Sequence, residues 1–431
     1  MENKDDVIPE TRVSYSRLEK LLQEALETRA KIKTGTSKRV GDLQGMLARI
    51  VKVSIEWSVE SPELPSSVIL KTPSQENAKE MEKAFEEAKE VGEDFKKLRE
   101  QTRDDKAAEQ MNANVHNQEC AFYAFAKGKE AKLMIPKVYF VERVDPINKE
   151  TGLIVMEDLS DRGFVKHFYD FADLPLLKDL AAAVARLQAE SLKDRSWQSC
   201  PELKKSFSEL LLSTVSDNVT PEVIEQGKQM MLRLMRQLPQ YYTEAIFDKF
   251  ERSSKSTMKE ALDEYSALIN AHKELSMPDV LCHGDLHMSN VFLKKDDNGD
   301  ERLAAIFDWQ ICCSGSPASD LGSFLTVSTS GPNRREHTME VLQHYYDTLK
   351  EEMGEEPVPF TLDQVVESYK SALKVGLLMR APGAPLAVQS DAPFEKAVDK
   401  AKAKANLLEN AVSMWHELIE LEDQGKLPWK N

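Results

Sequence analysis

The stretch from Val280 to Asp308 constrains the fold of this chain more than any other. Two short apolar runs flank a polar turn with an Asn-Gly dipeptide at 298–299. Both residues of this dipeptide tolerate positive φ angles, so the pattern predicts a β-hairpin. If its strands pair symmetrically about the turn, Asn290 and Asp308 lie opposite each other at the open end. Asp285, in the loop before the first strand, then brings a third oxygen-bearing side chain to the same place.

The spacing of polar residues in this stretch matches a kinase catalytic loop. His283, Asp285 and Asn290 follow the order His-x-Asp-x-x-x-x-Asn. In that loop the aspartate accepts the proton of the acceptor hydroxyl and the asparagine ligates Mg²⁺. Asp308 supplies a carboxylate for a second magnesium contact, because hard cations prefer oxygen ligands. The sequence therefore predicts Asp285 as a catalytic residue, with Asn290 and Asp308 as metal ligands.

Two other interpretations of the motif remain open at this point. Asp285 could cap backbone amides in an ordinary His-Gly-Asp turn. Alternatively, His283, Asp285 and His287 could chelate the metal of a hydrolase, although no further cluster of ligand-type residues follows in the sequence.

Two segments carry a family resemblance. His-Gly-Asp-Leu-His-Met-Ser-Asn at 283–290 and Ile-Phe-Asp-Trp-Gln at 306–310 resemble the aminoglycoside phosphotransferase and choline kinase group. The sequence looks closest to the CHK kinase-like branch, which includes the ecdysteroid kinase-like proteins. The resemblance implies an α+β, two-lobed protein-kinase-like fold, with a small antiparallel-sheet N-lobe and a larger, mainly helical C-lobe. It also implies ATP and Mg²⁺ as cofactors and a small-molecule alcohol as the acceptor.

A lysine and a glutamate upstream match the ion pair of this family. Lys71 ends an apolar strand before a proline. Taken alone, such a lysine is more often a solvated gatekeeper. The resemblance instead makes Lys71 a catalytic, ATP-binding residue that bridges the α and β phosphates. Glu119 precedes an aromatic pair on a predicted helix, and the resemblance makes it the partner of Lys71; the alternative is a surface glutamate.

Three further positions are expected to bind ATP. Gly45 follows Gly41 just before a predicted strand, where a glycine turn lets backbone N–H groups approach phosphates. Two glycines before a strand more often mark an ordinary turn. The apolar run 152–156 leads into Glu157 and Leu159, which by resemblance form the hinge whose main chain contacts the adenine edge.

Two residues are expected to give structural support to the catalytic loop. By resemblance these are His283 and Asp320, although Asp320 could equally be the N-cap of the next helix. Three late helices are predicted within 335–352, 362–380 and 394–424. Between the last two, the loop from Arg380 to Pro385 is expected to line an acceptor pocket.

The chain divides into two predicted lobes. Residues 1–157 form the N-terminal nucleotide-binding lobe, and 158–431 form the C-terminal catalytic and acceptor-binding lobe. Within the first, 74–117 is a dense alternation of Glu, Lys and Ala, which favours a solvated helical insertion.

Composition restricts the partners. The formal net charge of -16 argues against nucleic acid, which needs a basic surface. Five cysteines without a Cys-x-x-Cys pair predict reduced thiols. No apolar run approaches the roughly 18 residues of a membrane span, and the charged start of the chain lacks the pattern of a signal peptide. We therefore expect a cytoplasmic protein without a membrane span, and the sequence predicts no particular oligomeric state.

These observations predict an ATP- and Mg²⁺-dependent phosphotransferase. Its acceptor would be the hydroxyl of a small molecule such as a sterol-like, choline-like or xenobiotic alcohol. Protein-kinase activity is disfavoured, because Gly284 replaces the arginine that reads activation-loop phosphorylation and no Ala-Pro-Glu follows Asp308. The alternative is a catalytically silent kinase-fold protein that binds a ligand or a partner.

Overall fold

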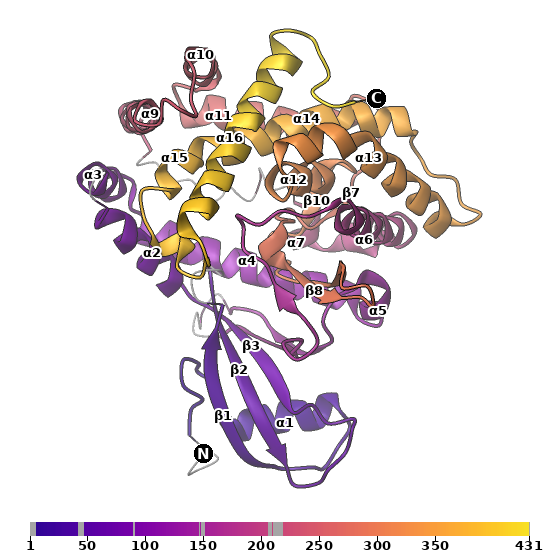
Figure 1. Cartoon of the computed structure of the whole chain (residues 1–431). Helices are drawn as coiled ribbons and strands as arrows, with labels where there is room; N and C mark the ends of the chain where they lie inside the picture. Colours follow the sequence, from indigo (N-terminus) through magenta and orange to yellow (C-terminus); the bar gives the residue numbers. More distant parts are fainter. Residues whose placement is uncertain are drawn as a thin grey trace.

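The computed structural model describes residues 6–41, 47–88, 91–145, 147, 151–205, 209 and 219–430. Figure 1 shows a small lobe built on a sheet, with β1, β2, β3 and α1, next to a larger helical lobe. The expected α+β, two-lobed fold is confirmed. Gly45, one of the expected ATP-binding residues, lies outside the described residues.

Five antiparallel strands form the small-lobe sheet, in the order β1-β2-β3-β5-β4. Apolar residues alternate along β2, which buries Val51 and Val53 on one face. Leu18 and Leu22 of α1 pack into the same hydrophobic cluster, so α1 covers that face. The elements are α1 (Tyr15–Ala25), β1 (Ile32–Val40), β2 (Ala48–Trp57), β3 (Ser67–Pro73), β4 (Val138–Glu142) and β5 (Leu153–Glu157).

Three helices follow β3: α2 (Glu76–Glu86), α3 (Gly92–Thr102) and α4 (Asp105–Ala126). The side chain of Asp104 caps α4 by accepting hydrogen bonds from two backbone N–H groups of its first turn. The second half of α4 is buried, including Glu119 and Phe122. A single helix thus runs from the polar segment into the core.

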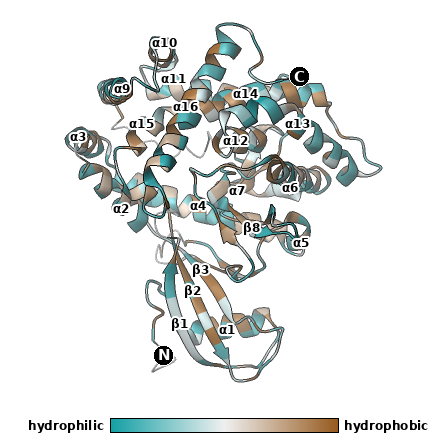
Figure 2. Cartoon of the chain, in the orientation of Figure 1, coloured by the Kyte–Doolittle hydropathy of each residue, from teal (hydrophilic) through white to brown (hydrophobic). Residues whose placement is uncertain are grey.

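Helix α6 (Leu174–Lys193) is largely buried, and it packs against α13. Alanines in the middle of α6 leave room for this close packing. All three predicted late helices are present, as α13, α14 and α16. Figure 2 shows hydrophobic residues along β3 and a mixture of hydrophobic and hydrophilic residues on the helices.

None of the described helices combines the length and the apolar composition that a membrane span requires. The other helices of this lobe are α5 (Glu130–Leu133), α7 (Pro201–Lys204), α9 (Pro221–Arg236), α10 (Glu244–Ser253), α11 (Met258–Asn270), α12 (Ser319–Val327), α13 (Gly331–Met353), α14 (Leu362–Arg380), α15 (Ala384–Ala387) and α16 (Lys400–Glu422).

The predicted hairpin is confirmed, but the predicted register was wrong. Asn290 lies opposite Phe307 rather than Asp308, and the Phe307 N–H donates to the Asn290 carbonyl at 3.0 Å. A register shift between Phe292 and Leu293 interrupts the symmetric pairing. Gly299 adopts the expected positive φ, 86°. The strands are β8 (Val291–Lys295) and β9 (Glu301–Ile306), with β6 (Phe164–Val165) beside β8, and β7 (Val280–Cys282) pairs separately with β10 (Cys313–Gly315).

Candidate active site

Lys71 is held by two carboxylates on the inner face of the small lobe. Side chains alternate between the two faces of β3. Val68 and Leu70 point into the hydrophobic core that α1 covers, so Lys71 points to the opposite face of the sheet. Its Nζ lies 2.5 Å from Oε2 of Glu119 and 2.5 Å from Oδ1 of Asp308. Lys71 is 4% exposed and Glu119 is 0% exposed. Neither is the solvated surface residue that the sequence left open.

The charge of Lys71 is fixed by these neighbours. Burial alone would lower its pKa, but the carboxylates of Asp308 and Glu119 outweigh burial and raise the pKa above its ordinary value. Lys71 therefore keeps its proton at neutral pH. A permanent ammonium group of this kind suits the binding of a phosphate oxygen.

Asp308 follows β9 in a left-handed backbone conformation, with φ at 68°. Aspartate tolerates this conformation better than most side chains. The next residue anchors the turn: the ring of Trp309 stacks on Phe122, with centroids 3.9 Å apart and planes 12° apart. Because Phe122 and Glu119 lie on the same helix, this stacking positions both carboxylates that bind Lys71.

Asp320 and His283 hold the loop that carries Asp285. The carboxylate of Asp320, which is 0% exposed, accepts the backbone N–H groups of His283 at 2.7 Å and Gly284 at 3.0 Å. Nε2 of His283 donates to the Phe307 carbonyl at 3.0 Å, and its Nδ1 accepts the Asp285 N–H at 3.2 Å. The N-cap interpretation of Asp320 was wrong, since α12 begins without a side-chain cap.

Gly284 lets this loop pass close to a neighbouring segment. Its φ is 85°, in the region that favours glycine. A Cβ added here would meet the carbonyl oxygen of Ile311. The close approach therefore requires glycine for two independent reasons.

Asp285 forms an ion pair that the sequence did not indicate. Nη2 of Arg380 donates to Oδ1 of Asp285, and Nε2 of His287 lies 3.4 Å from its Oδ2. Burial alone would raise the pKa of Asp285, but His287, Arg380 and His283 together hold it well below its usual range. Asp285 is therefore ionised at neutral pH and does not act as a backbone cap.

Arg380 is the last residue of α14. The sequence indicated only that it begins an acceptor-lining loop. The structure instead has helical turns after it, at Ala381–Gly383 and Ala384–Ala387. A basic residue at a helix C-terminus is a common pattern, and it does not identify a partner elsewhere in the chain.

Asn290 and Asp308 carry oxygen atoms suited to a cation. Nδ2 of Asn290 donates to the Asp285 carbonyl at 2.9 Å, so the amide oxygen is the atom that Asn290 can offer. Asp308 uses Oδ1 for Lys71, which leaves Oδ2. Both residues line the same pocket. One amide and one carboxylate oxygen are ligands that Mg²⁺ accepts, so this donor set fits magnesium.

The hydrolase interpretation finds no such support. Both ring nitrogens of His283 are hydrogen-bonded to the backbone, so neither is left for a metal. In the part of the chain that the structure describes, no group of three or more His, Cys, Asp or Glu side chains is arranged to hold a metal ion.

A pocket of about 230 Å³ lies between the lobes at Lys71. Ile50, Ile69 and Met156 from the small lobe and Phe292 from the larger lobe give it apolar walls, as is usual for small-molecule sites. The structure places six of the expected site residues around this pocket: Lys71, Glu119, Glu157, Leu159, Asn290 and Asp308.

The pocket also contains a pair that the sequence analysis missed. Nζ of Lys52 lies 2.6 Å from Oδ2 of Asp158. Burial alone would raise the pKa of Asp158, but hydrogen bonds from Lys52, Ser67 and Ser160 lower it to about 2. The sequence could have indicated that Lys52 faces the pocket, because alternation along β2 puts it on the same face as Ile50.

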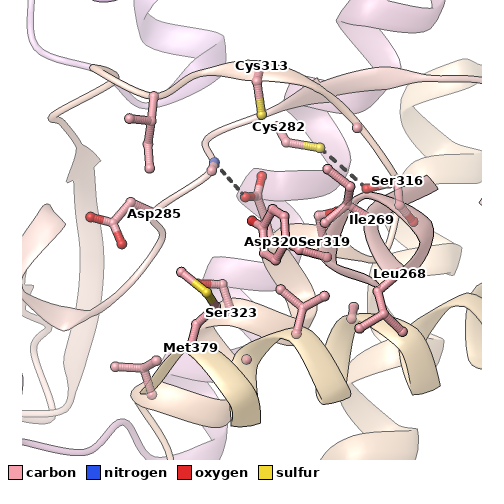
Figure 3. Close-up of a pocket in the computed structure, with 18 of the residues that line it drawn as sticks. Leu268, Ile269, Cys282, Asp285, Cys313, Ser316, Ser319, Asp320, Ser323 and Met379 are labelled. Carbon is pink, nitrogen blue, oxygen red and sulfur yellow. Dashed lines mark hydrogen bonds between the residues drawn. The ribbon is translucent and has the colours of Figure 1, made fainter. Parts of the chain in front are cut away.

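A second cavity, of about 320 Å³, borders the catalytic loop at Asp285 and Arg380. In Figure 3, Asp285 lies at one side of this cavity, and Leu268 and Ile269 lie at the opposite side. The loop 283–290 thus contributes to two cavities, with Asn290 in the first and Asp285 in the second.

A buried lysine shared by a helix glutamate and an aspartate after a hairpin, together with a braced His-x-Asp loop, defines a protein of the protein-kinase-like fold. The chain belongs to the DUF1679 family, whose model, described as "Uncharacterized oxidoreductase dhs-27", matches residues 2–426.

Two Caenorhabditis elegans proteins are similar in sequence. "Uncharacterized kinase-like protein D1044.1" is 36% identical over 117 residues, which are 26% of this chain and 30% of that protein. "Uncharacterized oxidoreductase dhs-27" is 26% identical over 263 residues, which are 59% of this chain and 29% of that protein. Each match therefore spans less than a third of the relative's own length.

Two solved structures illustrate the resemblance in fold. The choline kinase from Cryptosporidium parvum aligns with a TM-score of 0.47 at 12% identity, over 91% of this chain and 92% of its own. The Plasmodium vivax ethanolamine kinase aligns with a TM-score of 0.40 at 13% identity, over 88% and 82%. The sequence similarity to a kinase-like relative agrees with the kinase-like resemblance expected from the sequence.

Proposed function

We propose that this protein is an ATP- and Mg²⁺-dependent phosphotransferase that acts on the hydroxyl of a small molecule. The observation that carries this proposal is the pair of cavities at the loop 283–290. The first cavity contains the cation Lys71 and the oxygen ligands of Asn290 and Asp308. The second contains the carboxylate of Asp285. A phosphate donor in the first and an alcohol in the second would meet at this loop.

Each residue then has a role in positioning. Lys71 binds phosphate oxygens of ATP, and Glu119 keeps its ammonium group in place. The main chain around Glu157 and Leu159 holds the adenine, and Asn290 and Asp308 hold Mg²⁺. The bound metal supplies charge neutralisation at the phosphates. Most of the rate enhancement comes from positioning and electrostatic stabilisation.

The reaction transfers one phosphoryl group. Asp285 orients the acceptor hydroxyl and accepts its proton as the hydroxyl oxygen bonds to the γ-phosphorus. The bond from that phosphorus to the β–γ bridging oxygen breaks, and ADP leaves with the electron pair. Arg380 occupies Oδ1 of Asp285 in the structure, so the acceptor hydroxyl competes with Arg380 for this carboxylate.

The experiment measures ATP consumption with Mg²⁺ across a panel of neutral, cationic and polyhydroxylated alcohols. The Asp285→Asn variant serves as the paired control. We expect acceptor-stimulated turnover in the wild type and a loss of at least 100-fold in the variant, with nucleotide binding retained. Undiminished turnover in Asp285→Asn would exclude Asp285 as the proton acceptor.

A catalytically silent kinase-fold binding protein is the second candidate. The Arg380–Asp285 ion pair favours it, because Arg380 stabilises the ionised form of Asp285 and makes it a weaker base. The variant Arg380→Met separates the two candidates. A silent protein would bind nucleotide without turnover in both the wild type and this variant, over the whole panel.

A further inference from the structure

A third cavity, of about 460 Å³, adjoins the cavity at Asp285. The same four residues line both: Tyr265 and Leu268 from α11, and Val375 and Met379 from α14. These two helices pack against each other. These four residues therefore lie between the two cavities, and we call them the α11–α14 wall.

The residues around this wall are apolar but incompletely covered. Helix α11 buries only Leu262, whereas Met258, Leu268 and Ile269 are half-buried. On α14, Met379 is 51% exposed. Helices usually cover their apolar stripe against the core. A continuous apolar lining that the described chain leaves partly open is instead typical of a ligand site.

The polar groups are concentrated at one end of this space. Asp285 and Arg380 border the second cavity, near the hydroxyls of Ser319 and Ser323. Two lysines line the third cavity, but each is paired with a glutamate: Nζ of Lys255 lies 2.9 Å from a Glu264 oxygen, and Nζ of Lys228 lies 3.6 Å from a Glu225 oxygen. A ligand that follows both cavities would place one polar end at Asp285 and an apolar body beyond it.

The charge of Arg380 restricts which polar group of a ligand can bind at Asp285. Its guanidinium lies directly on the carboxylate where the acceptor hydroxyl would bind. Because Arg380 already balances the charge of Asp285, this end offers no unbalanced carboxylate to attract a cationic group, whereas an uncharged alcohol needs none.

We propose that the acceptor is an uncharged, elongated apolar alcohol, with its hydroxyl at Asp285 and its apolar body extending past the α11–α14 wall into the third cavity. This inference rests on the proposed function, which places the acceptor hydroxyl at Asp285. Passage requires rotation of wall side chains. Met379 is suited to this, because methionine is unbranched and adapts to different packing.

The first test is calorimetric titration of the wild-type protein with linear 1-alkanols from 1-hexanol to 1-dodecanol, without nucleotide. Each methylene removed from water is expected to tighten binding by about fourfold. Affinity should therefore rise through the series. An affinity that stops rising at the shortest members would overturn the extension into the third cavity.

Two tryptophan variants of α11 test where the alkyl chain of the bound alcohol lies. Ala261 lines only the third cavity, so Ala261→Trp fills that cavity. Ala267 is an exposed residue of the same helix and lines neither cavity. We expect Ala261→Trp to bind 1-dodecanol at least tenfold more weakly and 1-hexanol as the wild type does, and Ala267→Trp to match the wild type throughout. Unchanged 1-dodecanol affinity in Ala261→Trp would overturn the proposal.

A thermal melt and ATP titration check that Ala261→Trp is folded. Should it fail this check, Met258→Trp fills the same cavity from a half-buried position and replaces it, with the same expected result and the same contradicting one.

A matched pair of alcohols tests whether the site prefers an uncharged acceptor. Choline and 3,3-dimethylbutan-1-ol have the same shape, but only choline carries a positive charge. The neutral alcohol should bind at least tenfold more tightly, and the reverse order would contradict an uncharged acceptor.

The outcomes separate this inference from the proposed function, because the binding experiments need no turnover. Binding that strengthens with the length of the alcohol, but without phosphoryl transfer, would contradict the proposed phosphotransferase activity. It would not contradict the apolar acceptor site. Phosphoryl transfer confined to choline or to short polar alcohols would contradict the elongated apolar acceptor alone.

Discussion

Lys71 shares one positive charge between the buried carboxylate of Glu119 and the half-buried carboxylate of Asp308. Its partners come from distant parts of the chain, Glu119 from α4 and Asp308 from the end of β9. Removing such groups from water is unfavourable, and only close pairing offsets it. The stability of this region therefore depends on the charge of Lys71 beside both carboxylates.

The first prediction concerns Lys71→Met, which keeps most of the side-chain volume but removes the charge. Glu119 and Asp308 would then be left without a buried counter-ion. We expect the free energy of unfolding to fall by about 3–5 kcal/mol and ATP affinity to fall at least tenfold, measured by urea unfolding and by titration.

The double variant Lys71→Met/Glu119→Gln is the matched control. It should regain part of the lost stability, because one of the two opposing carboxylates becomes neutral, yet ATP affinity should stay low. A single variant Lys71→Met as stable as the wild type would show that the ion pairs contribute nothing net.

The catalytic loop and its hairpin act together as one element. Asp320 accepts two backbone N–H groups from the loop, and His283 ties the loop to Phe307 at the end of the hairpin. Burial raises the pKa of Asp320, against the opposing effect of His283 and these N–H groups. The position of Asp285 is thus determined from a helix later in the sequence.

The second prediction follows from that bracing. In Asp320→Asn one acceptor oxygen becomes an NH₂ group that faces a backbone N–H. The free energy of unfolding should fall by about 1–3 kcal/mol and turnover should fall with it. Nucleotide affinity should remain, because other residues line that pocket.

Asp363→Asn is the control for this substitution, since Asp363 is an exposed acidic residue in the first turn of α14. Unfolding curves and nucleotide titrations of both variants make the comparison. Equal stability of the two would show that the Asp320 hydrogen bonds do not hold the loop.

The hairpin and the late helices could be predicted because their patterns are local, whereas the kinase-like fold was implied by the family resemblance of 283–290 and 306–310. The register was wrong by one residue, because the turn closes with Asp296 opposite Asp300 and the shift at Phe292 makes up only part of the difference. The Arg380–Asp285 pair was missed for a different reason. These residues lie 95 positions apart, and a basic residue at a helix end does not indicate its partner.

At the scale of the whole molecule, α4 connects the lobes through buried polar contacts. Nε2 of His116 lies 2.9 Å from the Glu142 carbonyl of β4. Burial lowers the pKa of His116 from 6.5 to about 4. The folded protein therefore keeps this histidine neutral in a range where the unfolded chain protonates it.

The third prediction is the resulting pH dependence of stability. Between pH 6.5 and 4 the unfolded chain binds more protons at His116 than the folded protein, so stability falls as the pH falls. This contribution amounts to about 3 kcal/mol over the interval. Urea unfolding at several pH values measures it.

His116→Gln keeps a donor for the Glu142 carbonyl but cannot titrate. Its stability should fall less steeply than that of the wild type over this interval. His344→Gln, at a half-buried position of α13, should retain the wild-type slope, and identical slopes in all three proteins would contradict the role of His116.

The close approach of Gly284 to Ile311 restricts how this protein can be regulated. Kinases controlled by loop phosphorylation carry an arginine at this position of their His-Arg-Asp motif. Here any side chain would meet the Ile311 carbonyl and would also have to adopt a φ of 85°. A single substitution cannot install that phosphate sensor, because the backbone at 311 would have to move as well. Control by a phosphate that is read through an arginine at position 284 is therefore excluded for geometric reasons.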